Sequence, residues 1–224
     1  MRALEVFCGT KSFSRECERA GMTVTTVDNR QKFDPTICTD VLTWDFTTHP
    51  PVDVLWGGIP CTLFSVASKC RDPERGNELA LRFLEILKHF QGLNPNLLWG
   101  AENPWSSLLK KQTFMQGIPY SVCDYCQYGT KEENFGYRKR TIIFGNIPWT
   151  PKKCPGAGKC TEMVGNWHKA VAQHGKSTNS PPGIQKESFT QTQLYRMPPR
   201  LCRALVEAIG STHAPLSSGS TTPI

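Results

Sequence analysis

The sequence predicts an α/β fold with a largely parallel sheet, and two observations carry this prediction. The first is a strand, turn and helix at the start of the chain. Residues 3–7 are apolar and β-prone, residues 8–12 form a turn that contains Gly9, and residues 13–20 have helical periodicity. The second is an apolar strand at 52–56, which two glycines and a proline end abruptly. Because ligands bind at the carboxyl ends of strands in open α/β sheets, the residues that follow each strand are candidates for chemistry.

Length and composition favour one domain with a small appendage, since the chain has 224 residues and a mass of 25.1 kDa. No apolar run is long enough to span a bilayer, and the start lacks the apolar stretch and cleavage site of a secretory signal. We therefore expect a soluble intracellular protein without a membrane partner, in the cytoplasm or the nucleus. Ten cysteines in such a protein indicate reduced thiols or metal binding.

Positive charge is concentrated in the second half of the chain. Residues 1–100 contain 11 basic and 12 acidic residues, whereas residues 101–224 contain 15 and 7. A basic half fits a polyanionic partner, because lysine and arginine displace counterions from phosphates. An ordinary basic surface gives the same net charge, so composition leaves both interpretations open.

Two acidic residues follow predicted strands in the first part of the chain. Asp28 ends a strand at 23–27, roughly 20 residues after the glycine turn, where Rossmann-like folds bind the two ribose hydroxyls of a nucleotide. Asp40 lies in the next β-prone segment, residues 37–41. A solvated acid that closes a strand is the alternative interpretation of Asp28.

Cys61 follows the strand at 52–56, in the stretch Gly57-Gly58-Ile59-Pro60-Cys61. The alternative is a buried structural thiol, because free cysteine is among the most buried residue types. The position at a strand end favours a functional role.

Glu102 follows the next buried strand, at 97–101. A carboxylate at the end of an apolar run is costly unless it has a partner or a function, and a capping or turn role is the alternative. Since catalytic groups gather at strand ends, we expect Cys61 and Glu102 to lie close together.

A basic run, 138–140, enters another β-rich segment at 141–145. Arg138 and Arg140 are its candidate functional residues. A basic run is more often a solvated face, but here it leads directly into a strand, after Gly136 and Tyr137.

Taken in order, these segments resemble the motifs of cytosine-C5 methyltransferases. The shared features are Phe-x-Gly in the first turn, an acid after the second and third strands, Gly-Gly-x-Pro-Cys with a following Phe-Ser, Glu-Asn, and Arg-x-Arg. The resemblance covers residues 1–150 and a closing helix predicted at 195–209. Lys11, Pro104 and Gly136 stand where the family usually has Gly, Val and Gln. With these departures, the chain resembles a compact, divergent member of the family, of phage or virus type.

The resemblance implies a Rossmann-like S-adenosylmethionine-dependent methyltransferase fold. It implies methyl transfer from S-adenosylmethionine to C5 of cytosine in DNA, through a covalent Cys61 adduct with a flipped base. The implied catalytic residues are Cys61, Glu102, Arg138 and Arg140. The implied cofactor-binding residues are Phe7, Cys8, Gly9, Thr10, Phe13, Asp28 at the ribose, Asn29 beside the adenine, Asp40 at its amino group, Val41, Pro60 and Leu81.

Cysteine suits this chemistry because its thiolate is reactive near neutral pH. We expect a following helix N-terminus and nearby arginines to lower the pKa of Cys61 further. The expected partner is duplex DNA, and the expected enzyme is a monomer. Three alternatives stay open: an RNA (tRNA-type) cytosine-C5 methyltransferase, a catalytically inactive nucleic-acid-binding relative, and a nicotinamide oxidoreductase. The missing Gly-x-Gly-x-x-Gly motif speaks against the oxidoreductase.

Composition and resemblance together divide the chain into four parts. Residues 1–149 are the predicted catalytic and cofactor-binding domain. Residues 150–190 lose periodicity and form the predicted target-recognition insert. Residues 191–210 are a predicted helix that returns to the catalytic domain, and residues 211–224 a predicted disordered tail.

The insert and the segment before it contain the residue types that bind zinc. Cys154, Cys160 and His168 follow one another in the insert, and Cys126 precedes the basic run. These four residues are the predicted ligands of one structural zinc ion, with Cys123 as a competing ligand. A metal would stabilise a segment too short and polar to build its own core. The alternative is a set of scattered reduced thiols, because the spacing is wider than in common zinc motifs.

Overall fold

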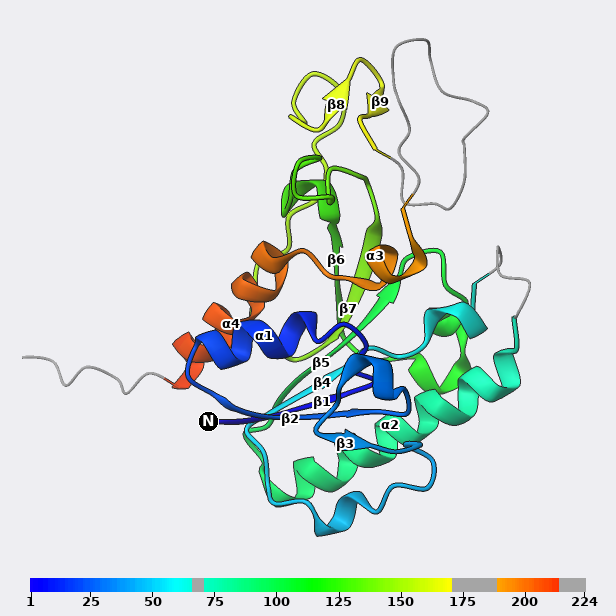
Figure 1. Cartoon of the computed structure of the whole chain (residues 1–224), viewed down its shortest axis with the longest axis vertical. Coiled ribbons are helices and arrows are strands. Elements are labelled where there is room, and N and C mark those ends of the chain that lie inside the picture. The colour runs from blue at the N-terminus through cyan, green and yellow to red at the C-terminus, as the bar shows by residue number, and fades with distance from the viewer. Residues whose placement is uncertain (66–70, 171–188, 214–224) are drawn as a thin grey trace, which may run out of the picture.

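The computed structural model describes residues 1–65, 71–170 and 189–213. Within these residues a seven-stranded sheet forms the centre of the molecule, in the order β3-β2-β1-β4-β5-β7-β6 (Figure 1). β1 to β5 are parallel to one another, and β7 lies between β5 and β6 and is antiparallel to both. The predicted Rossmann-like α/β fold is therefore confirmed. The strands are β1 (Arg2–Val6), β2 (Thr23–Asp28), β3 (Ile37–Cys38), β4 (Val54–Gly57), β5 (Leu98–Pro104), β6 (Tyr120–Asp124) and β7 (Arg140–Gly145).

Helices cover both faces of the sheet (Figure 1). α1 (Ser12–Arg19) and α4 (Pro199–His213) pack together on one face, and α2 (Pro73–Leu93) covers the other. One apolar cluster lies under α1 and α4, and a second lies under α2. Short 3₁₀ helices fill the connections at Gln31–Phe33, Phe46–Thr48, Cys61–Leu63, Leu109–Lys111, Thr113–Met115 and Tyr125–Gln127.

From residue 77 the sequence has apolar residues at helical spacing, which predicts a helix there, and α2 begins four residues earlier, at Pro73. The Asp72 side chain caps the helix by accepting a hydrogen bond from the backbone N–H of Arg75 at 3.1 Å. Pro73 occupies the first turn, where its fixed φ and missing N–H cost nothing. Polar capping therefore set this boundary. The charged, turn-rich stretch 69–76 predicts a loop, but residues 73–76 belong to α2, and residues 69 and 70 lie outside the described residues.

The closing helix is divided and longer than predicted. α3 (Gln191–Tyr195) ends before the Pro198-Pro199 pair, and α4 continues to His213. The predicted tail at 211–224 therefore begins inside a helix, and residues 214–224 lie outside the described residues. Arg203 of α4 pairs with Glu16 of α1 at 3.4 Å, which supports the predicted return of this helix to the first βα unit.

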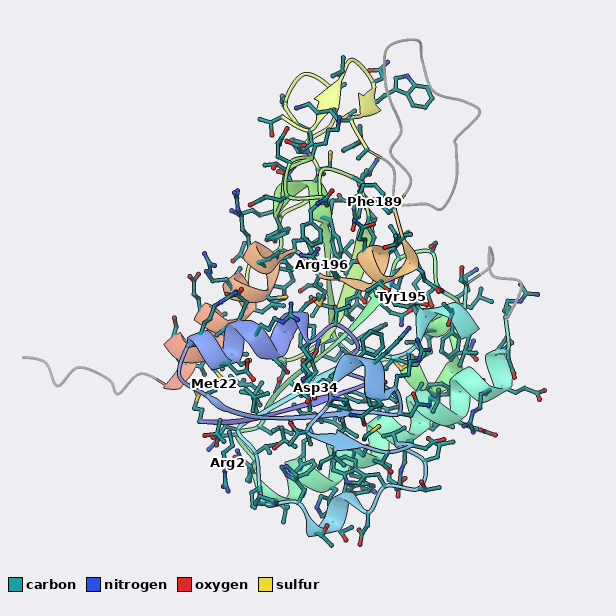
Figure 2. All side chains as sticks on the ribbon, viewed as in Figure 1. Arg2, Met22, Asp34, Phe189, Tyr195 and Arg196 are labelled. Atoms are coloured by element: carbon teal, nitrogen blue, oxygen red, sulfur yellow. The ribbon has the colours of Figure 1, made fainter. Side chains whose placement is uncertain are left out.

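A small two-stranded sheet, β8 (Met163–Val164) and β9 (Trp167–His168), projects beyond the main sheet (Figure 1). Phe189, Tyr195 and Arg196 lie between this projection and the main sheet (Figure 2). The Phe189 ring packs edge-on against Tyr137, with 5.0 Å between centroids. Residues 171–188 of the predicted recognition insert are outside the described residues. None of the helices described is both long and apolar enough to cross a bilayer.

Candidate active site

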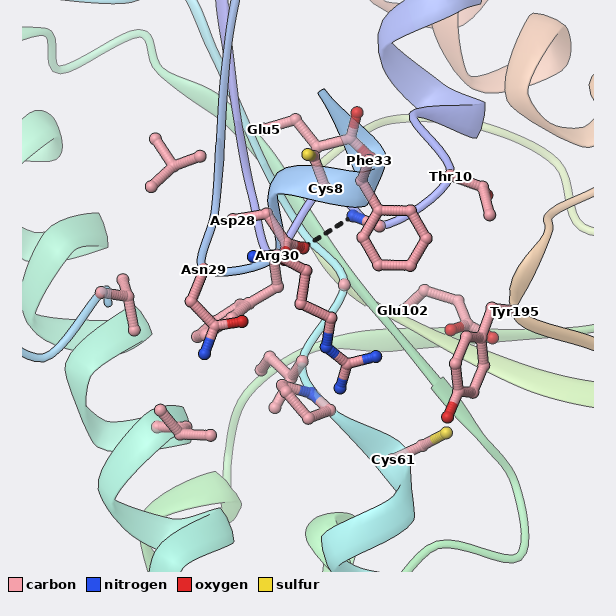
Figure 3. A pocket seen from close by; sticks show the side chains of 18 of the residues that line it. Glu5, Cys8, Thr10, Asp28, Asn29, Arg30, Phe33, Cys61, Glu102 and Tyr195 are labelled. Carbon is pink, nitrogen blue, oxygen red and sulfur yellow. Dashed lines mark hydrogen bonds between the residues drawn. The ribbon is translucent and has the colours of Figure 1, made fainter. Parts of the chain in front are cut away.

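A cavity of about 350 Å³ opens at the carboxyl ends of β1, β2, β4 and β5 (Figure 3). This is the edge at which α/β sheets bind ligands. Most of the side chains that the sequence predicted for cofactor and catalysis line it. They are Phe7, Cys8, Gly9, Thr10, Asp28, Asn29, Asp40, Val41, Pro60, Cys61 and Glu102.

The Asp28 carboxylate organises the first turn of the cavity. One oxygen accepts a hydrogen bond from the backbone N–H of Gly9 at 2.9 Å, and the other accepts from the backbone N–H of Arg30 at 2.9 Å. Gly9 has φ +47° and Lys11 has φ +54°, so both adopt the left-handed conformation. Lys11, which replaces the family's usual glycine, keeps the backbone geometry that glycine favours, and its ammonium group pairs with Asp34 at 3.2 Å.

Two buried groups near the first strand have raised pKa values. Burial raises the pKa of the Glu5 carboxyl from 4.5 to about 7, although hydrogen bonds from Ser14 lower it in part. Burial also raises the pKa of the Cys8 thiol to about 12. Cys8 is therefore a neutral thiol at physiological pH, which suits a lining role.

Cys61 begins the 3₁₀ helix that follows β4 and is half-buried. Its loop is anchored to β5 by buried Asn103, whose side-chain amide donates to the carbonyl of Ile59 at 2.9 Å. A side chain at Gly58 would come within 2.7 Å of the Phe7 carbonyl, so only glycine lets the loop lie this close to β1. The Glu-Asn pair thus has a second role, in which Asn103 positions the cysteine loop.

The pKa of Cys61 differs from the sequence-based expectation. Burial raises the pKa of its thiol, Lys139 partly offsets this increase, and Glu102 adds to it. The expected lowering by a helix N-terminus and two arginines is therefore wrong, because the residue is desolvated and the nearby cation is a lysine.

Glu102 lies within β5, and its carboxylate is 14% exposed. One oxygen, Oε1, accepts from the Thr141 hydroxyl at 2.9 Å and from the Tyr125 hydroxyl at 3.2 Å. The Lys139 ammonium group lies 3.4 Å from the same oxygen. This set of partners excludes a simple turn or capping role and holds the carboxylate at the cavity.

Arg138 and Arg140 do not line the cavity. Arg140 Nε lies 3.1 Å from Asp124 Oδ1, and Arg138 Nε lies 3.4 Å from it. Asp124 is fully buried. Burial favours its neutral form, but the bonds from Arg140 and from the Cys154 N–H outweigh this and lower the pKa of Asp124. The arginines therefore compensate a buried charge, and Lys139 between them faces the cavity instead.

Two predicted cofactor residues also lie away from the cavity. Leu81 is 48% exposed on α2, and Leu79 lines the cavity in its place. Phe13 is buried in the core, where its ring stacks on Trp56 at 4.3 Å. Helical periodicity identified the right face of α2 but not the residue nearest the ligand edge.

Sequence reasoning missed several lining residues, which are Arg30, Phe33, Arg75, Lys139, Tyr195 and Met197. Figure 3 shows the Tyr195 hydroxyl pointing toward the Cys61 sulfur. Arg75 of α2 pairs with Asp40 at 3.4 Å. Tyr195 and Met197 come from the far end of the chain, so no local pattern placed them here.

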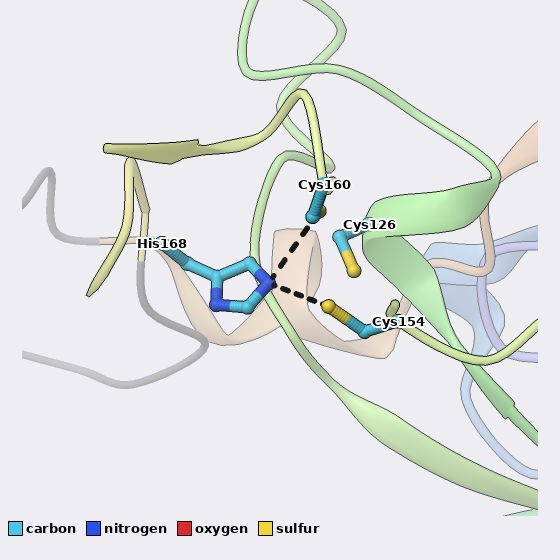
Figure 4. A group of neighbouring side chains, drawn as sticks. All are labelled: Cys126, Cys154, Cys160 and His168. Atoms are coloured by element: carbon cyan, nitrogen blue, oxygen red, sulfur yellow. Dashed lines mark hydrogen bonds between the residues drawn. The ribbon is translucent and has the colours of Figure 1, made fainter. Parts of the chain in front are cut away.

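The four predicted metal ligands lie together beside β6 and the small sheet (Figure 4). The ligand atoms of Cys126, Cys154, Cys160 and His168 all lie within 4.8 Å of one another. His168 Nε2 is 3.4 Å from Cys154 Sγ and 3.9 Å from Cys160 Sγ. Burial, followed by nearby Arg138, lowers the pKa of His168 and favours the neutral ring that binds metals.

A neighbouring side chain, Gln127, is also directed at this Cys₃His cluster. The Gln127 side-chain amide lies 3.7 Å from Cys126 Sγ and 3.6 Å from Cys160 Sγ, where it donates toward both sulfurs. Cys123, the predicted competitor, is buried in β6 and is not part of the cluster. The cluster could therefore hold a metal ion.

Comparison with known proteins agrees with this geometry. The model of a family described as C-5 cytosine-specific DNA methylase matches residues 1–103. No curated protein matches the chain. The methyltransferase EhMeth of Entamoeba histolytica superimposes with a TM-score of 0.56 at 10% identity, over 95% of this chain and 98% of that one, which supports the fold.

Two larger structures are also similar. A prophage-encoded E. coli protein described as a DNA modification methyltransferase has 18% identity and a TM-score of 0.49, over 64% of this chain and 45% of its own. S. pombe Dnmt2 has 15% identity and a TM-score of 0.46, over 67% and 50%. This chain thus spans about half the length of either protein. The family prediction itself is confirmed for the part of the chain that carries Cys61 and Glu102: residues 1–103 match the C-5 cytosine-specific DNA methylase family.

Proposed function

We propose that this protein transfers a methyl group from S-adenosylmethionine to C5 of cytosine in DNA. One observation carries the proposal: Cys61 after β4 and Glu102 on β5 line the same cavity as Asp28 at the end of β2 and Asp40 after β3. A nucleophile, a carboxylate and a nucleotide-binding edge are the three parts that the reaction needs. The match of residues 1–103 to the methylase family supports the same assignment.

The residues present fit S-adenosylmethionine. The Gly9 turn brings backbone close to the cavity, and the Asp28 carboxylate keeps acceptor capacity beyond its two backbone bonds. Asp28 would hold the ribose hydroxyls, and Asp40 the adenine amino group. When bound, the cofactor supplies an electrophilic methyl group.

The chain's own residues account for the activation of cytosine. The Cys61 thiolate adds to C6 of the base, which makes C5 nucleophilic toward the methyl group. Glu102 holds N3 and the exocyclic amine, so the ring accepts the electrons. After methyl transfer a base removes the C5 proton, the C5–C6 double bond reforms, and the C6–S bond breaks to release the Cys61 thiolate. A duplex hides both faces of the base, so the cytosine must flip out of the stack.

We assign the DNA contacts to the basic second half of the chain. Residues 1–149 provide catalysis and cofactor binding, and residues 150–190 provide target recognition. Exposed Lys152, Lys153 and Lys159 near the cysteine cluster supply the charge that a phosphate backbone requires. We propose a monomer acting on duplex DNA.

The test is methyl transfer from labelled S-adenosylmethionine to duplex DNA and, in parallel, to tRNA, with bisulfite sequencing of the product. We expect labelled 5-methylcytosine in DNA, abolished in Cys61→Ser and retained in Cys38→Ser, which changes an exposed cysteine. Methylation of tRNA alone would replace the DNA assignment by the RNA one. Unchanged turnover in Cys61→Ser would refute the covalent mechanism.

We further propose that Cys126, Cys154, Cys160 and His168 bind one structural zinc ion. Tetrahedral zinc with Zn–S bonds of about 2.3 Å separates its ligand atoms by roughly 3.5–3.8 Å. The approach of these four atoms to within 4.8 Å of one another is close to that spacing. The N–H groups of Gln127 directed at two sulfurs supply the outer contacts that orient metal ligands.

Elemental analysis of the purified protein should find close to one zinc per chain. The double variant Cys154→Ser, Cys160→Ser should lose the metal and bind DNA more weakly, while cofactor binding persists. Cys38→Ser is the matched control and should keep the zinc. Folded protein that binds DNA and contains no metal would end this proposal.

A further inference from the structure

The register of β7 decides which residues of the basic run 138–140 reach the cavity. β7 runs antiparallel to β5, with Thr141 opposite Pro104 and Ile143 opposite Glu102. Successive side chains of a strand point to opposite faces, so Lys139 lies on the side of Thr141 and the two arginines lie on the other. The Thr141 hydroxyl donates to Glu102, and Lys139 lines the cavity.

The Lys139 ammonium group is held by three fixed partners. Nζ lies 3.4 Å from Glu102 Oε1, 3.4 Å from the Tyr125 hydroxyl and 3.3 Å from the carbonyl oxygen of Leu194. It also lies over the Tyr125 ring, 4.8 Å from the centroid. The side chain is only 14% exposed. An ammonium group has three protons to donate, so these contacts fix its position.

Resting on the proposed methyltransferase function, we propose that Lys139 is the positioning residue of this active site. Its ammonium group orients the Glu102 carboxylate and stabilises the Cys61 thiolate by its charge. The arginines on either side of it, which the motif would assign to the site, are engaged with buried Asp124 instead.

The surroundings of Cys61 disfavour the charged form of its thiol. Burial and the Glu102 carboxylate both disfavour the thiolate, and Lys139 is the strongest influence in the opposite direction. Among the residues that the structure describes, Tyr195 from α3 and Arg30 after β2 are the other titratable or charged side chains directed into this part of the cavity (Figure 3). Tyr195 is neutral at physiological pH because burial raises its pKa further.

The test compares Lys139→Met, which removes the charge and keeps the length, with Lys139→Arg, which keeps the charge. Lys88→Met removes an exposed charge on α2 and is the control. The first readout is the rate at which iodoacetamide alkylates Cys61 between pH 6 and 10, followed on the Cys61 peptide by mass spectrometry. It needs neither cofactor nor DNA. The second is the separation of kcat from KM in methyl transfer.

Lys139→Met should raise the apparent pKa of Cys61 by about one unit and slow alkylation at neutral pH roughly tenfold. It should lower kcat by about tenfold or more with the affinity for S-adenosylmethionine unchanged, and Lys139→Arg should recover part of both effects. An alkylation profile in Lys139→Met identical to wild type would overturn the inference, whatever the methylation result. If wild-type protein methylates neither DNA nor tRNA, the proposed function fails, and a shifted profile still supports the action of Lys139 on Cys61.

Discussion

Replacing Glu5 by glutamine should change how the stability of this protein depends on pH. Glu5 lies in β1, is 4% exposed and accepts hydrogen bonds from the backbone N–H and the hydroxyl of Ser14. Burial raises its pKa from 4.5 to about 7. In the unfolded chain the carboxyl titrates near its ordinary value. The native state therefore holds an extra proton between these two pH values.

The size and sign of the effect follow from this shift. Each pKa unit corresponds to about 1.4 kcal/mol, so the rise from 4.5 to about 7 corresponds to about 3 kcal/mol. This stabilisation is fully present below pH 4.5 and is lost as the pH rises through about 7, where the native state must carry a buried carboxylate. Glutamine is neutral at every pH and its oxygen can still accept from Ser14. Glu5→Gln should therefore resemble wild type near pH 4.5 and be more stable by about 3 kcal/mol at pH 8.

Urea unfolding at several pH values between 4.5 and 8 measures the free energy of unfolding of both proteins. Because other groups titrate equally in both, the difference between the two curves isolates Glu5. Glu18→Gln, which changes an exposed glutamate on α1, is the control and should stay within about 0.5 kcal/mol of wild type at every pH. Parallel curves for Glu5→Gln and wild type would refute the reasoning.

Three further substitutions test the site and its supports. Asp28→Ala should weaken S-adenosylmethionine binding by about 1–3 kcal/mol in calorimetry. Asp28→Asn retains an acceptor for the Gly9 N–H and should weaken binding less. Equal affinities in wild type and both variants would remove Asp28 from the cofactor site. Asn103→Ala leaves the Ile59 carbonyl without its donor and should cost about 1–3 kcal/mol in urea unfolding as well as methyl transfer, and unchanged kcat would argue against positioning of the Cys61 loop. Arg140→Met should destabilise the protein by about 1–3 kcal/mol, because buried Asp124 loses the two hydrogen bonds from Arg140. The alkylation rate of Cys61 should stay unchanged. A slower alkylation would show that Arg140 acts in the active site.

Much of the cavity was predictable from the sequence because of how parallel sheets are built. Apolar strands that end at glycine, proline or an acid are local patterns, and parallel strands carry their carboxyl ends to one edge. Asp28, Cys61 and Glu102 are such strand-end residues, and all three line the cavity. The predicted metal ligands followed from residue type, since cysteine and histidine with no other role in a reduced protein favour metal binding.

Only the tertiary structure decided the register of the basic run. Lys139 is one position from Arg138 and from Arg140. Neighbouring side chains of a strand point to opposite faces, so the lysine and the arginines cannot reach the same site. Pairing of β7 with β5 directs Lys139 and Thr141 to Glu102. The arginine side chains face away from it, toward Asp124.

The same distinction holds at single residues elsewhere in the site. Cys123 and Cys126 are three positions apart, and β6 ends between them, so only Cys126 reaches the cluster. Leu79 and Leu81 are both apolar positions of α2, but residues two apart lie on nearly opposite faces of a helix, so Leu79 lines the cavity and Leu81 is exposed. Tyr195 and Met197 reach the cavity because α4 packs on α1 at the opposite end of the chain.

The sequence by itself determined the fold, the strand ends and the reactive residue types, because these depend on local pattern. The choice among neighbouring residues depended on register and packing, which are set by contacts distant in the chain.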